Sequence, residues 1–201
     1  MVPDILDLVI ASWQEIPAPA PHSSEDQITY QLCRALRRNR NARGLPFRID
    51  PQAVELDPLQ PAELGRMDIT FSPPINREAY YFCLESKRLN VIRDENVRSY
   101  ASEYVTFGML RFITGQYAKE VRHGGMLAYV LDGDIGRAIN NVESNIRNQH
   151  DRLGMTAPGR FETSSVLPAD SRVRETRHRR PHEPWLFRIH HLFMAVSVTT
   201  R

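Results

Sequence analysis

The side chains best suited to chemistry are four charged groups in the first half of the chain: Glu25, Asp68, Glu85 and Lys87. Carboxylates are hard oxygen ligands of the kind that Mg²⁺ prefers. Such a cation acidifies a bound water and neutralises charge that grows on a phosphate under attack. A lysine close by can position the attacking water, because it is a compact charge on a flexible stem. If these four groups converge, the chemistry they favour is hydrolysis of a phosphodiester bond.

Two predicted strands would bring three of these groups together. The first strand covers 66–71 and carries Asp68 on its polar face. The second covers 79–87 and is apolar on both faces for most of its length, which is typical of a central strand. Glu85 and Lys87 lie two residues apart at its end and therefore share a face. We expect the strands to pair antiparallel, in a register that brings Asp68 beside Glu85.

A predicted helix would supply the fourth group. Ser24 can cap this helix, and Gln27 three residues later can complete a capping box. The helix should end in a run of arginines before Gly44. Glu25 lies three residues before Ile28, so it extends the apolar stripe and should point inward.

Patterns of hydrophobicity and capping predict one domain over 22–201, preceded by an N-terminal segment, 1–21, that ends in a Pro-Ala linker. Within the domain we expect helices and strands to alternate, and an Arg- and His-rich β extension to follow at the C-terminal end. The further elements are a helix from Asp94 to about Val121, either continuous or broken near Gly108 or Gly115, a strand over 126–131, a helix capped by Asp134, and strands over 162–167, 172–178 and 185–194.

The composition narrows the class of protein. The 201 residues carry a net charge of +2, and the two cysteines, Cys33 and Cys83, predict buried thiols and no disulfide scaffold. No apolar stretch approaches the roughly 18 residues that a membrane span needs, so we expect a soluble, cytoplasmic protein without membrane contact. Six arginines and no acid lie within 34–48. Such a patch suits phosphate, although an ordinary solvated surface explains it equally well.

The candidate catalytic residues also form a pattern that resembles the motif of a known family. Asp68, followed by the Glu85–Lys87 tripeptide at the end of a hydrophobic strand and preceded by Glu25 on a helix, resembles the PD-(D/E)xK nuclease superfamily. Met67 replaces the proline of the nominal motif. The resemblance covers roughly 22–132, and it implies an α/β, restriction-endonuclease-like fold with a mixed β-sheet flanked by α-helices.

The resemblance implies a metal-dependent endonuclease. It makes Asp68, Glu85 and Glu25 the ligands of Mg²⁺, with Mn²⁺ as a substitute, and Lys87 the catalytic lysine, so that all four residues are catalytic. The expected partner is nucleic acid, with DNA ahead of RNA, in defence against foreign DNA, restriction or repair. A homo-oligomer or a complex with a protein partner is also expected. Residues predicted to contact nucleic acid are Arg111, His178, Arg180 and Arg188.

Three other interpretations fit the same residues. Glu85 and Lys87 could form a simple salt bridge at a strand end, and Glu25 could be favoured in the first helical turn by the helix dipole alone. The chain could instead be a non-catalytic nucleic-acid-binding or scaffolding subunit that keeps the nuclease fold. It could also be a nuclease toxin held by an inhibitor.

Overall fold

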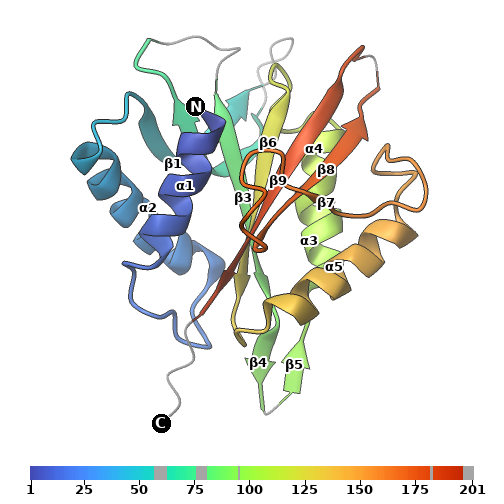
Figure 1. The fold of residues 1–201 in the computed structure, drawn as a ribbon, viewed down its shortest axis with the longest axis horizontal. Helices are drawn as coiled ribbons and strands as arrows, with labels where there is room; N and C mark the ends of the chain where they lie inside the picture. The colour runs from blue at the N-terminus through green and yellow to red at the C-terminus, as the bar shows by residue number, and fades with distance from the viewer. Residues whose placement is uncertain (57–62, 76–80, 95, 182, 197–201) are drawn as a thin grey trace.

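The computed structural model describes residues 1–56, 63–75, 81–94, 96–181 and 183–196, and these form an α/β fold with a seven-stranded mixed sheet flanked by helices (Figure 1). The helical elements are α1 (Val2–Trp13), α2 (Glu25–Ala42), α3 (Ala101–Tyr104), the π-helical turn η1 (Val105–Met109), α4 (Leu110–Ile113) and α5 (Ile135–Asn148). The strands are β1 (Arg48–Leu56), β2 (Glu63–Ser72), β3 (Phe82–Leu89), β4 (Val91–Arg93), β5 (Asn96–Arg98), β6 (His123–Val130), β7 (Glu162–Thr163), β8 (Val173–Arg179) and β9 (Leu186–Ala195). Within this described part of the chain, no helix has the length and apolar character needed to cross a membrane.

The large sheet has the strand order β1-β2-β3-β6-β9-β8-β7. β1, β2 and β3 pair antiparallel, β3, β6 and β9 pair parallel, and β8 and β7 continue antiparallel from β9. The segment α3–η1–α4 connects β3 to its parallel neighbour β6, as a parallel pair requires a crossover. The central strands β3, β6 and β9 are buried for most of their length, which explains their continuous apolar runs.

Each face of the sheet carries its own helical layer and core. α1 and α2 cover one face, and α3, η1, α4 and α5 cover the other (Figure 1). Ile69, Phe71 and Leu84 pack on the first face, whereas Cys83 and Met126 pack on the second. Because β3 contributes alternate residues to both cores, its last residues lie between the two helical layers.

Helix α2 forms as predicted. The Ser24 side chain accepts a hydrogen bond from the Gln27 amide, and the Gln27 side chain accepts one from the Ser24 amide, which completes the capping box. The chain leaves the helix at Gly44, whose φ of 62° lies in the left-handed region that glycine tolerates. Both features fix where Glu25, the first residue of the helix, meets the sheet.

The N-terminal segment, which the sequence analysis set apart from the domain, contains a helix that was not predicted. α1 buries Ile5, Leu8 and Val9 completely in the core that α2 also covers. The indole Nε1 of Trp13 donates a hydrogen bond to the carbonyl of Ala195 at 2.8 Å. Residues 2–13 therefore belong to the same packed unit as the sheet.

The helix predicted from Asp94 is wrong at its start, whereas the predicted break near Gly108 or Gly115 is matched by a helical segment that ends at Ile113. Residues 91–98 hold the β4–β5 pair, and Asp94 lies between the two strands with a φ of 46°, which Asp tolerates better than most residues. The helical segment starts at Ala101, and Gly115, with a φ of 75°, follows its end. Asp94 therefore lies in a tight turn between two strands and does not begin a helix.

The predicted strands are otherwise largely confirmed. β2, β6, β8 and β9 match the predictions, and β3 begins within the predicted range 79–87, of which residues 79 and 80 lie outside the described residues. The predicted strand over 162–167 is reduced to the two residues of β7. β1 was not predicted, because Pro51 interrupts it, and proline is tolerated there on an edge strand.

Candidate active site

The candidate active site lies where β2 and β3 separate. The last paired residues of the two strands are Ile69 and Leu84. At the next position a side chain replaces the backbone as the hydrogen-bond partner of β3. Asp68 Oδ2 accepts a hydrogen bond from the Ser86 amide at 2.7 Å. The predicted antiparallel register, with Asp68 beside Glu85, is therefore confirmed.

Lys87 is held by three oxygen atoms inside this opening. Its Nζ donates to Glu25 Oε1 at 3.0 Å, to Glu85 Oε1 at 2.8 Å and to the Ser86 carbonyl at 2.7 Å. Burial alone lowers the pKa of Lys87, but the charges of Glu85 and Glu25 outweigh burial, so the pKa is raised above its usual value. The ammonium group is therefore charged and fixed in one position.

Glu85 lies at the centre of the site, and its side chain is only 1% exposed. Its Oε1 accepts hydrogen bonds from Lys87 and from Arg111 Nη1, each at 2.8 Å. Its Oε2 is buried and has no hydrogen-bond partner among the described residues. Burial and the charge of Asp68 raise the pKa of Glu85 to about 7, although Lys87 and Arg111 act in the opposite direction. An unpaired buried carboxylate oxygen is costly, so this atom is available to a ligand.

Asp68 has a second partner that the sequence did not reveal. Its Oδ1 accepts a hydrogen bond from Gln52 Nε2 at 3.2 Å, and burial raises the pKa of the Asp68 carboxyl. Gln52 lies in β1 with a φ of 53°, between residues 51 and 53, which pair with residues 69 and 67 of β2. A left-handed residue other than glycine costs roughly 1–3 kcal/mol and is concentrated at functional sites. No local sequence signal marks a glutamine for this conformation.

Arg111, predicted to contact nucleic acid, belongs to the site itself. Its Nη1 donates to Glu85 and also to the Tyr117 hydroxyl at 2.8 Å, and that hydroxyl donates to the Arg66 carbonyl at 2.7 Å. One third of the Arg111 side chain is exposed. The guanidinium therefore connects the buried carboxylate to the surface.

A glycine lets the crossover segment approach the site closely. A Cβ on Gly108, in the π-helical turn η1, would lie 2.3 Å from Met126 Cε and 3.7 Å from Lys87 Cγ. Glycine lets η1 rest against the strand that carries Lys87 without displacing the flexible end of Met126. π-helical turns of this kind are frequent at functional sites.

Two other predicted nucleic-acid contacts are corrected by their burial. His178 is completely buried, and its ring contacts the Leu153 carbonyl and the Thr176 hydroxyl, each at 2.7 Å. Arg180 is 4% exposed and donates to the Ala118 carbonyl at 2.8 Å. Both side chains are buried and form hydrogen bonds inside the protein, so neither is accessible to a phosphate.

Arg188, the last of these predictions, lies away from the site. On β9 it pairs with His123 at the start of β6, whereas Lys87 is opposite Ala128, five residues further along β6. At about 3.3 Å per residue the two positions are roughly 17 Å apart along the sheet. The Nε of Arg188 lies 3.4 Å from the buried carboxylate of Glu175, and this ion pair accounts for its placement.

The donor chemistry of the site fits Mg²⁺ at Asp68 and Glu85. Within the described residues, no three His, Cys, Asp or Glu side chains are arranged to hold a metal ion. Mg²⁺ commonly needs only one or two carboxylates, because it retains several waters. The unpaired Oε2 of Glu85 and the neighbouring charge of Asp68 leave negative charge uncompensated. Glu25 and Asp68 each already accept two hydrogen bonds, Glu25 from Lys87 and the Arg88 amide and Asp68 from the Ser86 amide and Gln52, so Asp68 would have to share its oxygens with a cation. Glu85 Oε2 is the unpartnered buried oxygen among these three carboxylates.

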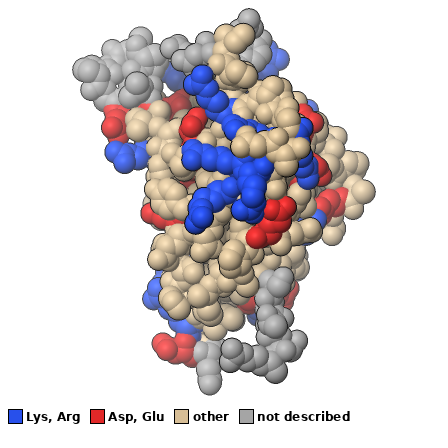
Figure 2. Space-filling model, turned by 90° about the vertical axis from the view of Figure 1, so that its left-hand side faces the viewer, with Lys and Arg blue, Asp and Glu red and all other residues tan. Residues whose placement is uncertain are grey.

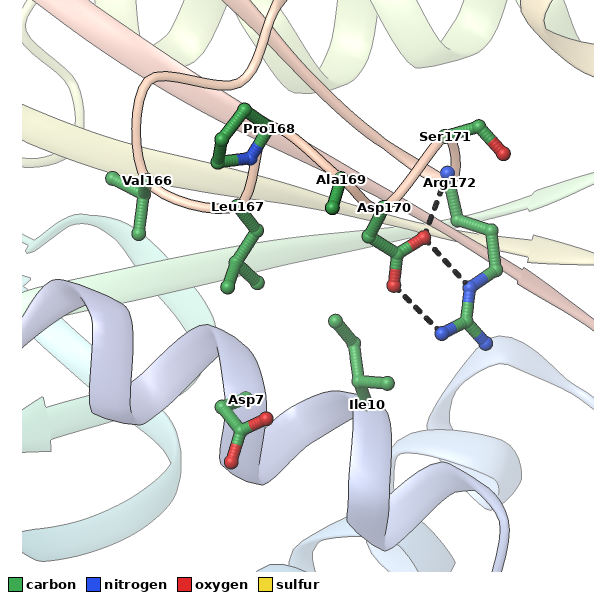
Figure 3. Close-up of a pocket in the computed structure, with 9 residues that line it drawn as sticks. All are labelled: Asp7, Ile10, Val166, Leu167, Pro168, Ala169, Asp170, Ser171 and Arg172. Atoms are coloured by element: carbon green, nitrogen blue, oxygen red, sulfur yellow. Dashed lines mark hydrogen bonds and ion pairs between the residues drawn. The ribbon is translucent and has the colours of Figure 1, made fainter.

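A separate cavity of about 590 Å³ lies between α1 and the segment 166–172 (Figure 3). Its charged groups are paired, since Asp170 binds Arg172 at its edge and Asp7 binds Arg43. None of its lining residues is among those with an unpaired buried polar atom in the described structure. This cavity therefore contains no sign of catalytic chemistry.

Comparison with known proteins gives no match: neither family models, nor curated proteins, nor solved structures are similar to this chain. The chemistry of the site is therefore argued from its own geometry.

Proposed function

We propose that the protein is a metal-dependent nuclease of the PD-(D/E)xK type that hydrolyses phosphodiester bonds, with DNA as the preferred substrate. The observation that carries the proposal is the meeting of Asp68, Glu85 and Lys87 in one opening between β2 and β3. The order of elements supports it, since α2, β2, β3, the crossover segment and β6 occur in the order that the resemblance implies, with β1 added between α2 and β2 and the β4–β5 pair added after β3.

In this proposal Asp68 and Glu85 hold the cation, Mg²⁺ or Mn²⁺, which supplies positive charge that stabilises the phosphate as negative charge develops on it. Glu25 is a positioning residue, because its Oε1 accepts a hydrogen bond from Lys87 Nζ and so helps to fix the ammonium group beside Glu85. The three N–H groups of Lys87 already donate to Glu25, Glu85 and the Ser86 carbonyl, so one of these hydrogen bonds is exchanged when Lys87 donates to the attacking water or to a phosphate oxygen. Arg111 keeps one nitrogen on Glu85 and can offer others to the phosphate, because guanidinium binds oxygen pairs.

The test incubates the purified chain with plasmid DNA and with RNA, in Mg²⁺ or in EDTA. Wild-type protein is compared with Asp68→Asn and Lys87→Met, and with Asp151→Asn as a matched control, because the Asp151 side chain is 92% exposed. We expect Mg²⁺-dependent cleavage that falls at least about 100-fold in the two site variants, a typical loss for a group acting at the reacting centre. The control should cleave like the wild type.

Cleavage that persists in EDTA, or in both site variants, would overturn the proposal. Tight binding of nucleic acid with no cleavage in Mg²⁺ or Mn²⁺ would instead favour the scaffolding subunit. RNA cleaved faster than DNA would overturn the substrate preference but leave the chemistry intact.

A further inference from the structure

One helix connects the candidate site to an arginine-rich surface. The first residue of α2, Glu25, contacts Lys87, and the arginines lie in the later turns of the same helix and just beyond it. The stretch 27–49 contains six arginines and no acid. The site opens toward solvent at this end of α2, since the Glu25 side chain is 30% exposed.

Four exposed side chains form a stripe along α2, which we call the α2 polar face: Gln27, Gln31, Arg34 and Arg38. Their spacing of four, three and four residues places them on one side of the helix. The buried residues of α2, such as Leu32 and Leu36, point to the other side. The α2 polar face therefore runs along the outer side of α2, from the turn that holds Glu25, whose own side chain points inward to the sheet, to the arginine-rich end.

The surface around this face carries a surplus of positive charge. Figure 2 shows Lys and Arg side chains gathered in one patch on the side of the molecule that α1 and α2 occupy in Figure 1. In and just after α2, six arginines (34, 37, 38, 40, 43 and 48) have three described acids within ion-pair distance, Asp50, Glu15 and Asp7. Arg34 has no ion pair with any described acid. The pair of Arg38 with Glu15, at 3.1 Å, is largely exposed, and such pairs are weak and easily exchanged.

We infer that the α2 polar face binds the phosphate backbone of the same nucleic-acid molecule whose bond is cut beside Lys87, an inference that rests on the proposed nuclease function. Guanidinium groups suit phosphate because their fork binds two oxygens. A surplus of positive charge, with Glu15 as the one described acid paired to the stripe, favours a polyanion over an acidic peptide, which would need specific contacts.

The helix geometry sets the reach of this surface. Arg34 and Arg38 follow Glu25 by 9 and 13 residues, or about 14 and 20 Å at 1.5 Å per residue. A duplex advances about 3.4 Å per base pair, so these distances correspond to roughly four to six base pairs from the cut. The inference therefore predicts a minimum length of duplex on one side of the scissile bond.

The first experiment measures binding by fluorescence anisotropy of a 30-base-pair duplex in EDTA over a range of salt. The double variant Arg34→Ala/Arg38→Ala is compared with Arg152→Ala/Arg160→Ala, whose arginines are exposed and follow α5 on the other layer. The logarithm of the affinity falls as the logarithm of the salt concentration rises, and each lost phosphate contact makes this slope about 0.9 less steep. We expect a decrease of about 1.8 for the α2 variant and none for the control.

The second experiment measures cleavage in Mg²⁺ of duplexes in which the arm on each side of the cut is shortened in turn. With long arms, the α2 variant should require a higher substrate concentration than wild type, with maximal rate unchanged. With the relevant arm below about four base pairs, the two proteins should cleave equally.

Equal salt slopes, or a defect that does not depend on arm length, would overturn the inference while the nuclease proposal stands. Wild-type protein that binds through these arginines but cleaves nothing would end the nuclease proposal and the shared-substrate inference with it. A loss of self-association in the α2 variant, measured by light scattering, with unchanged binding of DNA would assign the face to a second copy of the chain.

Discussion

Glu85 determines the electrostatics of the candidate site. It is buried between Lys87 and Arg111, which would satisfy one carboxylate, yet its second oxygen has no partner and Asp68 adds another negative charge nearby. A proton and a divalent cation are two ways to supply the missing positive charge, so they should compete for this carboxyl group.

We therefore predict that binding of Mg²⁺ releases a proton near neutral pH. Because the pKa of Glu85 is raised to about 7, the carboxyl is protonated at lower pH and must ionise before it can act as a ligand. The apparent affinity for Mg²⁺ should fall about tenfold per pH unit below 7 and level off above it. Titration calorimetry at pH 6, 7 and 8, in buffers with different ionisation enthalpies, measures both quantities. An affinity that stays constant from pH 6 to 8 would contradict this assignment.

At the residue scale, the sequence predicted the convergence of Asp68, Glu85, Lys87 and Glu25, because strand alternation and a capping box fix where each points. Their catalytic roles remain predictions. The contact from Gln52 could not be predicted, because it depends on a left-handed residue in an unpredicted edge strand. His178 and Arg180 were misassigned because strand pattern alone does not tell which segments cover a side chain.

At the element scale, the start of α2 couples helix stability to the site. We predict that Ser24→Ala costs about 1 kcal/mol of unfolding free energy, a typical loss for an N-cap, and that it also lowers cleavage because Glu25 follows the cap directly. Asp134→Ala is the matched control, since Asp134 caps α5 by accepting from the Arg137 amide, in the other helical layer. Both variants should lose similar stability in urea denaturation, but only Ser24→Ala should lose activity. An equal loss of activity in both would mean that the cap acts only through global stability.

Elements with strong local signals were predicted well, and the others were not. α2 and α5 carry caps and regular apolar stripes, and β3 has a continuous apolar run. The region 94–121 has helical spacing of its apolar residues, but the structure uses its first part as a hairpin, because tertiary context outweighs local propensity. β1 is stabilised by its pairing with β2, and this long-range information is not present in a single sequence window.

At the scale of the whole molecule, a buried chain of hydrogen bonds crosses the second core. His178 Nδ1 donates to the Leu153 carbonyl, which can only accept. With both histidines neutral, His178 Nε2 accepts from the Thr176 hydroxyl, which in turn accepts from His191 Nε2, and His191 Nδ1 accepts from the Tyr104 hydroxyl. Burial of both rings lowers their pKa and so favours these neutral forms.

We predict that acid destabilises the protein through these histidines. Burial lowers the pKa of His178 to about 4, and that of His191 well below its usual value. Between pH 6.5 and 4 these histidines are protonated in the unfolded chain but stay neutral in the folded chain. Each histidine therefore lowers the free energy of unfolding by about 1.4 kcal/mol per pH unit as the pH falls. Urea denaturation from pH 7 to 4.5 measures the slope.

His178→Gln should make that slope shallower by one proton, whereas His22→Gln, at an exposed position, should leave it unchanged. The comparison is needed because the raised pKa of Glu85 acts in the opposite sense: its ionisation removes stability as the pH rises through 7. Identical slopes for the wild type and His178→Gln would show that the buried chain does not govern acid sensitivity.

The position of β9 has a consequence for synthesis. This strand, at residues 186–195, lies between β6 and β8, and its Ala195 carbonyl receives the Trp13 indole across 182 residues of sequence. A ribosome must therefore have synthesised residues 1–195 before the middle of the sheet can close, and contacts between such distant segments form slowly. During that interval β6 presents an open edge to other nascent chains, and unpaired edges of this kind are where aggregation begins.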